Sequence, residues 1–225
     1  MAVWGFNARW LPIFLGLGEP SEKELMAALG TLLVGLVAAA FGQFRIATLL
    51  LFAASVGAAD GLNVFRRSQK LAKTLGVSRS LPLFLRGSYV WLLAAAALGI
   101  WAASADTHGG IWGASRHALT VGFLSTMVFG IGQRVLPAFC GMRVLFSKSL
   151  MGLSLATLNL GCLLRVASEI PAYEANLRAA WMVLPASAVI ELSAVTVFAL
   201  NMAITLALPP PVSAAALRPR AEMVG

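Results

Sequence analysis

Long runs of apolar residues recur along this chain and predict membrane-spanning helices. A helix needs about 20 mostly apolar residues to cross the roughly 30 Å hydrocarbon core of a bilayer. The pattern predicts six such helices, at about residues 25–41, 45–65, 83–103, 113–136, 147–167 and 178–208. A strand-like alternation of apolar and polar residues does not recur, so a β-barrel is not expected. The predicted fold is an all-α membrane protein, a bundle of about six transmembrane helices.

Prolines mark several of the expected helix ends, because proline lacks the backbone N–H that an interior helical position requires. Pro82 is expected to open the third helix, where the missing N–H is tolerated. Pro137 is expected to end the fourth helix, and the run that starts at Pro209 is expected to stop the sixth. Pro185 predicts either a kink or a late start in the sixth helix.

The composition supports a membrane protein and excludes several other classes. Of the 225 residues, 59% are hydrophobic and 12% are charged, and the mean hydropathy is +0.84. A soluble domain carries about 25% charged residues, so this chain cannot cover a globular surface in water and is not expected to be a soluble enzyme. Two cysteines exclude a disulfide scaffold. The net charge of +8 does not indicate nucleic-acid binding, because its distribution follows the loops.

The basic residues predict an orientation, because cytoplasmic loops carry an excess of Lys and Arg. If the segment 66–86 is cytoplasmic, the 17 basic residues divide 13 to 4 between the two sides. The four on the outer side are Arg45, Arg116, Arg165 and Arg178. Both termini are then cytoplasmic. We expect residues 1–24 to form an interfacial N-terminal segment, in which Trp4, Phe6, Trp10 and Phe14 suit the headgroup region. Residues 25–208 are expected to form the six-helix domain. Residues 209–225 are expected to form a flexible cytoplasmic tail.

Ionisable residues inside the predicted spans are costly in lipid and are therefore functional candidates. Asp60 lies between Gly57 and Gly61, which favours close helix packing, although a coupling role stays open. Glu191 lies near the middle of the sixth span and must be protonated or paired, either in a structural hydrogen bond or in a proton relay. Arg134, at the inner end of the fourth span, is expected to reach lipid phosphates. Arg165 is expected to pair with Glu169 one turn later or to hold an anionic ligand.

Two histidines are candidate ligands for haem or a metal. His117 opens the fourth predicted span, and His108 precedes it in the outer loop. A neutral imidazole that projects from a helix is a common axial ligand of haem iron. Its other ring nitrogen needs an acceptor, which Thr120 could supply one turn on. The alternative is an interfacial histidine without a ligand.

A copper site has weaker support in the sequence. Cys140 and Met142 form a Cys-x-Met pair whose sulfur atoms suit Cu(I), but a single pair in a short loop is not specific. Cys162 lies toward the opposite side of the membrane, so we expect no disulfide between the two cysteines. No set of nucleophile, base and acid residues can be assembled, and no catalytic residue is assigned.

Three segments resemble the NnrS family of bacterial inner-membrane proteins, which are linked to haem, copper and nitric oxide metabolism. The most specific is Arg116-His117-Ala118-Leu119-Thr120-Val121-Gly122, followed by Thr126-Met127 and Arg134. The others are Trp4-Gly5-Phe6 with Arg9-Trp10-Leu11-Pro12, and Arg86-Gly87-Ser88-Tyr89-Val90-Trp91-Leu92. The family proteins have about twice as many spans, so this chain resembles their C-terminal half.

The resemblance implies a multi-pass protein of the bacterial inner membrane that binds haem b and acts in nitric oxide or nitrosative-stress metabolism. His117 would be the axial ligand, and Arg116, Arg165 or Arg178 would meet the propionates. Family members tend to carry a histidine shortly after the basic residue that ends the fourth span. In this chain the region holds no histidine, which disfavours a copper or second haem site there unless Cys140 substitutes.

Two alternatives stay open. The chain could be a non-catalytic subunit or assembly partner whose helices pack against other transmembrane helices, from a missing half or a second copy. It could also be a small transporter with Glu191 and Asp60 as the coupling residues.

Overall fold

The computed structural model describes residues 2–67, 78–140 and 145–208, and these residues form helices joined by short connections. Six helical segments are long and apolar enough to cross a membrane. They are α2 (Glu22–Ala40), α3 (Phe44–Gly61), α4 (Leu81–Ala105), a continuous segment Gly110–Phe139, α7 (Lys148–Glu174) and α8 (Arg178–Ala207). The predicted number of spans is confirmed, and most of the predicted boundaries are correct to within a few residues.

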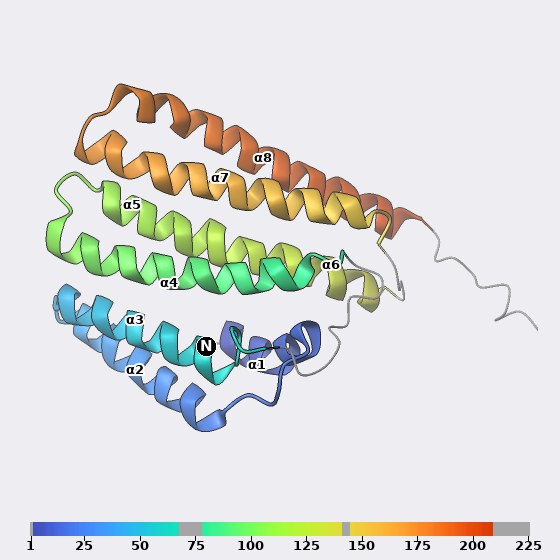
Figure 1. The fold of residues 1–225 in the computed structure, drawn as a ribbon, viewed down its shortest axis with the longest axis horizontal. Coiled ribbons are helices and arrows are strands. Elements are labelled where there is room, and N and C mark those ends of the chain that lie inside the picture. Colours follow the sequence, from blue (N-terminus) through green and yellow to red (C-terminus); the bar gives the residue numbers. More distant parts are fainter. Residues whose placement is uncertain (1, 68–77, 141–144, 209–225) are drawn as a thin grey trace, which may run out of the picture.

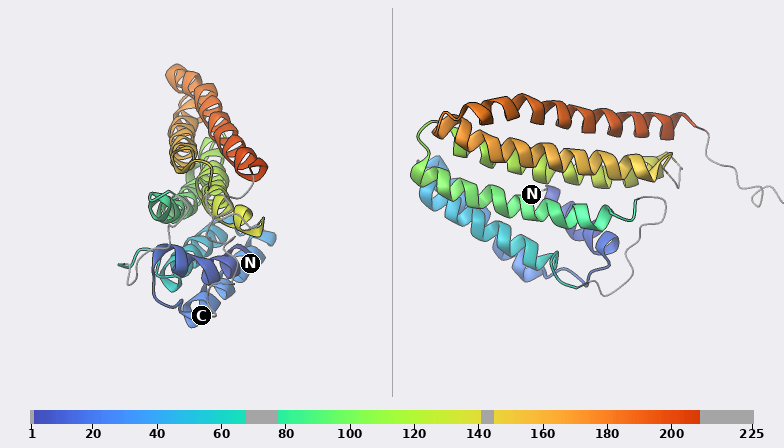
Figure 2. Two further views of the ribbon diagram at one scale, coloured as in Figure 1. Left: turned by 90° about the vertical axis from the view of Figure 1, so that its right-hand side faces the viewer. Right: turned by 45° about the horizontal axis from the view of Figure 1, so that its top comes forward.

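The spans lie side by side in a row that follows the chain order (Figure 1). The principal contacts join α2 to α3, α3 to α4, α4 to the Gly110–Phe139 segment, that segment to α7, and α7 to α8. An end-on view shows the same order, with α2 and α3 at one edge and α8 at the other (Figure 2). The two edges are correspondingly exposed, since only 11% of the α2 window and 17% of the α8 window are buried.

The connections divide the bundle into two ends. One end, here the short-loop end, holds the connections 41–43, 106–109 and 175–177 (left in Figure 1). The other, the long-loop end, holds the C-terminal ends of α3, α8 and the Gly110–Phe139 segment. Arg45, Arg116 and Arg178, which were predicted to share one side, all lie toward the short-loop end. Successive spans therefore alternate in direction.

Small residues let α2 and α3 pack closely, as the Gly57 and Gly61 spacing predicted. A Cβ atom on Gly57 would lie 3.3 Å from the Cβ of Ala28 on α2. A Cβ atom on Gly61 would lie 3.1 Å from the Cβ of Glu24, also on α2. Neither position has room for a larger side chain, so these glycines fix how closely the two helices approach.

The N-terminal helix α1 (Ala2–Leu15) lies at the long-loop end, against α4. Its Asn7 side chain donates a hydrogen bond to the hydroxyl of buried Tyr89 on α4, at 2.9 Å. The prediction that Phe14 faces the headgroup region is wrong, because its side chain is 3% exposed and belongs to the hydrophobic core. Trp10 is partly exposed and stacks on Phe14, with ring centroids 6.1 Å apart. The side chains of Trp4 and Phe6 lie outside the described residues.

The prolines act partly as predicted. Pro82 lies in the first turn of α4, which begins at Leu81. Pro137 lies inside the final turn of its helix, which ends two residues later at Phe139. Helix α8 is continuous from Arg178 through Pro185, so the prediction of a late start is wrong. The residues from Pro209 onward, including the predicted tail, lie outside the described residues.

Candidate functional site

His117 lies at the end of α5 (Gly110–His117), and two oxygen atoms face one of its ring nitrogens. Its Nδ1 lies 3.0 Å from the carbonyl oxygen of Gly113, one turn earlier in the same helix. The same Nδ1 lies 2.9 Å from Oε2 of Glu169 on α7. Two acceptors at Nδ1 favour the tautomer in which Nδ1 carries the hydrogen and Nε2 keeps its lone pair. Within the described part of the chain, no hydrogen bond is formed to Nε2.

Thr120 is not the acceptor that the sequence analysis expected. Its hydroxyl donates a 2.8 Å hydrogen bond to the carbonyl oxygen of Arg116, one turn earlier. Such bonding to the preceding turn is common for threonine in helices. The partner of His117 therefore comes from a different helix.

Glu169 is the residue that completes this site, and its side chain is only 8% exposed. Glycine on α5 makes room for it, because a Cβ atom on Gly113 would lie 2.7 Å from the Cδ of Glu169. The Nε of Arg165 lies 3.7 Å from Oε2 of Glu169, which confirms the predicted pair one turn apart on α7. The carboxylate thus lies between an imidazole and a guanidinium in the half of the bundle toward the short-loop end.

A π-helical segment, η1 (Ala118–Ser125), follows His117 directly and joins α5 to α6 (Thr126–Phe139). The hydroxyl of Ser125 donates to the carbonyl oxygen of Thr120, five residues earlier, at 3.0 Å. Gly122 packs against the indole of Trp91 on α4, so closely that a Cβ atom there would lie 2.5 Å from Cγ of the ring. π-Helical turns are rare and often lie at functional sites, since they change which side chains face a neighbouring helix.

Glu191 on α8 extends the group of ionisable side chains toward the middle of the bundle. It packs against Gly161 on α7, where an added Cβ would lie 2.6 Å from Cγ of Glu191. Electrostatic interactions link it to His117, Arg165 and Glu169. Its Oε1 is buried and has no hydrogen-bond partner among the described residues. Cys162 follows Gly161 on α7 and is buried. Its Sγ–H donates a weak hydrogen bond of 3.7 Å to the carbonyl oxygen of His117.

His108 lies apart from this group, in the connection before α5. Its backbone N–H donates to Oε1 of Glu174 at 3.2 Å. The same carboxylate accepts the N–H of Gly110 at 3.0 Å and so caps the first turn of α5. Arg116 and Arg178 are both exposed near the same end of the bundle. The structure thus gives this connection a capping role, and it places the side chains of two candidate propionate contacts at the surface.

A family model for a domain of unknown function, DUF8744, matches residues 14–206. The chain belongs to the DUF8744 family. No curated protein and no solved structure matches it. The match covers all six spans and therefore includes every member of the site around His117, while the resemblance to the NnrS family stays a prediction.

The remaining candidates of this DUF8744 chain lie away from His117. Asp60 is at the long-loop end of α3, where Oδ1 pairs with Nη2 of Arg66 at 3.4 Å. Arg134 is half-buried in α6, and Cys140 is exposed directly after that helix. Met142, the other half of the predicted copper pair, lies outside the described residues. In the described ranges no group of three or more His, Cys, Asp and Glu side chains could hold a metal ion.

Two polar networks between the helices, one partly buried and one buried, were missing from the sequence analysis. On α4, Trp91 donates from Nε1 to Oδ1 of Asn159 on α7 at 2.8 Å. On α8, fully buried Asn201 donates to Oε1 of Gln133 at 2.9 Å and to the carbonyl oxygen of Ser147 at 3.0 Å. Amides near the middle or end of an apolar run are a signal that could have identified them, because lipid offers such groups no partner.

Proposed function

We propose that this chain is a multi-pass membrane protein that binds haem b through Nε2 of His117, in the half of the bundle toward the short-loop end. The observation that carries the proposal is the arrangement at Nδ1, which faces the carbonyl oxygen of Gly113 and the carboxylate of Glu169. Metal-ligating histidines almost always donate their other ring N–H to a carboxylate or a backbone carbonyl, which fixes the tautomer and orients the ring. His117 has this arrangement, and its Nε2 is the nitrogen left for a ligand.

The donor set suits haem better than a copper or zinc site built from side chains. A zinc or copper site takes several protein ligands, and the described residues contain no such group. Haem iron needs only axial ligands from the protein, because the porphyrin supplies the others. A single oriented imidazole is therefore enough on this side of the iron, and the second ligand would be Met, water or a residue of another subunit.

The charges around His117 fit the acidic propionates of haem. Arg116 and Arg178 are exposed near the same end, and neither forms an ion pair with an acidic side chain among the described residues. Arg165 is already engaged by Glu169, so we assign the propionates to Arg116 and Arg178 first. The side chain of His117 is 30% exposed, which lets a planar ligand approach from outside the row of helices, where lipid, further helices or a second copy would cover it.

The cellular context of the proposal rests on the sequence. The resemblance to the NnrS family supports a role in nitric oxide or nitrosative-stress metabolism in the bacterial inner membrane. The distribution of basic residues supports an orientation with both termini in the cytoplasm, which would place His117 toward the outer leaflet.

An absorption spectrum of the full-length protein, purified in mild detergent and titrated with haem, tests the proposal. We expect a Soret band that His117→Leu abolishes and that the matched control His108→Leu leaves intact. Glu169→Gln should weaken haem affinity about 10–100-fold, since that is the usual effect of losing the group that orients a ligating histidine.

A cavity variant separates loss of the ligand from loss of the fold. His117→Gly should lose the Soret band, and added imidazole should restore it by occupying the space of the missing ring. An unchanged spectrum in folded His117→Leu protein, or a wild-type protein that binds no haem, would refute the proposal.

A further inference from the structure

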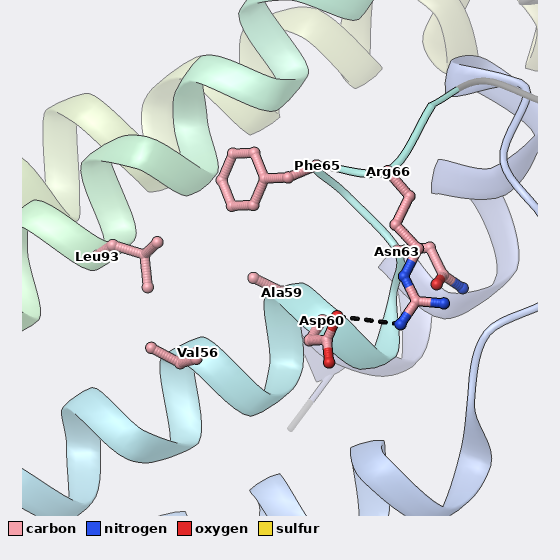
Figure 3. Close-up of a pocket in the computed structure, with 7 residues that line it drawn as sticks. All are labelled: Val56, Ala59, Asp60, Asn63, Phe65, Arg66 and Leu93. Atoms are coloured by element: carbon pink, nitrogen blue, oxygen red, sulfur yellow. Dashed lines mark hydrogen bonds and ion pairs between the residues drawn. The ribbon is translucent and has the colours of Figure 1, made fainter.

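A cavity of about 280 Å³ lies between α3 and α4 toward the long-loop end, whereas His117 lies in the other half of the bundle (Figure 3). One part of its lining is polar and comes from Asp60, Asn63 and Arg66. The other part is apolar and comes from Val56, Ala59, Phe65 and Leu93. The cavity therefore has a charged rim and an apolar wall, and it lies where a membrane-spanning helix ends.

The rim carries two opposite charges that are both accessible. Nη2 of Arg66 lies 3.4 Å from Oδ1 of Asp60, and the two side chains are 64% and 58% exposed. An exposed pair at this distance is weak, so a ligand that offers both charges can replace it without a large loss. A guanidinium binds phosphate oxygens well, and a carboxylate accepts hydrogen bonds from a primary ammonium group.

The wall lies where an acyl chain would lie. Val56 is 42% exposed and lies one turn before Asp60 on α3. It is therefore farther than Asp60 from the end of the helix that forms the rim. Leu93 on α4 faces Val56 and Ala59 across the cavity, and the Phe65 ring lies above them (Figure 3). A cavity needs only about 10–15 Å³ of such space to hold one water, so this one has room for a headgroup and the start of a chain, while the rest would lie in the bilayer.

We propose that this cavity binds a phospholipid with a primary-amine headgroup, of the phosphatidylethanolamine class. Its phosphate would meet Arg66, its ammonium would meet Asp60, and one acyl chain would follow Val56 and Leu93. The backbone of Arg66 is held for this role, because Nη2 of Arg86 on α4 donates to its carbonyl oxygen at 3.1 Å.

The charges select this headgroup over two common alternatives. A purely anionic headgroup would gain the attraction of Arg66 but would meet the carboxylate of Asp60 with nothing to bind it. A choline headgroup carries a positive charge but has no N–H to donate to that carboxylate. A free phosphate ion would use the rim alone and would not depend on the apolar wall.

Native mass spectrometry of the delipidated full-length protein in detergent tests the proposal by counting lipid adducts. The probes are dioleoyl phosphatidylethanolamine, phosphatidylcholine and phosphatidylglycerol at equal concentrations. We expect several-fold more ethanolamine-lipid adduct than choline-lipid adduct. Asp60→Asn should remove that preference, and Arg66→Gln should reduce the adducts of all three lipids.

Filling the cavity should have the same effect as removing its charges. Val56→Trp should reduce every adduct, whereas Val189→Trp, at an exposed position on α8, should not. Glu22→Gln, which removes an exposed carboxylate outside the cavity, should leave the lipid preference unchanged. Equal binding of the ethanolamine and choline lipids, stronger binding of phosphatidylglycerol, or no effect of Asp60→Asn would overturn the proposal. The measurement uses lipid mass only, so its outcome is independent of haem binding.

Discussion

Replacing Gly113 by alanine should test whether the α5–α7 interface is built around Glu169. Gly113 lies one turn before His117, and the Glu169 side chain fills the space that a Cβ would take. The new methyl group would lie 2.7 Å from Cδ of Glu169 and closer still to Oε1. Because Glu169 is 8% exposed, its carboxylate has little room to move and would be pushed away from His117.

The expected change in the free energy of unfolding combines one stabilising effect with two destabilising ones. Alanine in place of glycine favours the helix by about 1 kcal/mol. Overpacking a filled interface typically costs about 1–3 kcal/mol. Moving the carboxylate away from Nδ1 of His117 would also weaken that contact, by about 0.5–1.5 kcal/mol, while Arg165 remains 3.7 Å from Glu169. We therefore expect Gly113→Ala to lower the free energy of unfolding by about 1–3 kcal/mol.

Equilibrium unfolding in detergent measures this change, with Gly132→Ala as the matched control. Gly132 lies on the same membrane-spanning segment, and a Cβ there would meet its nearest atoms at ordinary distances of 3.9 and 4.0 Å. That variant should be unchanged or slightly more stable. In a double-mutant cycle, Gly113→Ala should cost less when Glu169 is already alanine, since the collision is then gone. Equal stability of the two glycine variants would refute this account of the interface.

Two further substitutions probe the packing of the other helices. Gly122→Ala should lower the free energy of unfolding by about 1–3 kcal/mol because its Cβ would overlap the Trp91 ring, and Trp91→Leu should relieve most of that loss. The same unfolding assay measures both variants, and a Gly122→Ala protein of unchanged stability would contradict this prediction. Asn201→Leu should cost about 2–4 kcal/mol because it removes partners from Gln133 and from the backbone of Ser147; a loss below about 0.5 kcal/mol would show that these buried groups find other partners.

The positions of the spans could be predicted from the sequence because they depend on composition alone. Each apolar run had to be long enough to cross the bilayer, and the structure has a helix at each of them. Some ends were displaced, because helices continue past the apolar run where a cap or a turn stabilises them. α7, for example, continues to Glu174, whose carboxylate caps the first turn of α5.

The site could be predicted only in part, because hydropathy does not say how each helix is rotated against its neighbours. His117 was identified by its type, and the pair of Arg165 with Glu169 by its spacing along one helix. The contact between Glu169 and His117 crosses from α7 to α5 and depends on the absence of a side chain at Gly113. The π-helical segment after His117 also changes the rotation of the rest of its span, and no residue pattern predicted it.

The charges of the site restrict how His117 could bind iron. An unbalanced charge inside a bilayer is costly, and Arg165 is always cationic, so it offsets Glu169. The balance then depends on His117 and Glu191, which must be both neutral or both charged. If His117 binds iron as proposed, its imidazole is neutral with the hydrogen on Nδ1, and the charge of the iron would add to the balance that involves the buried carboxyl group of Glu191. A protonated imidazole has no lone pair for iron, so a condition that protonates His117 would oppose haem binding. Haem binding at His117 and the charge of Glu191 are therefore expected to be coupled.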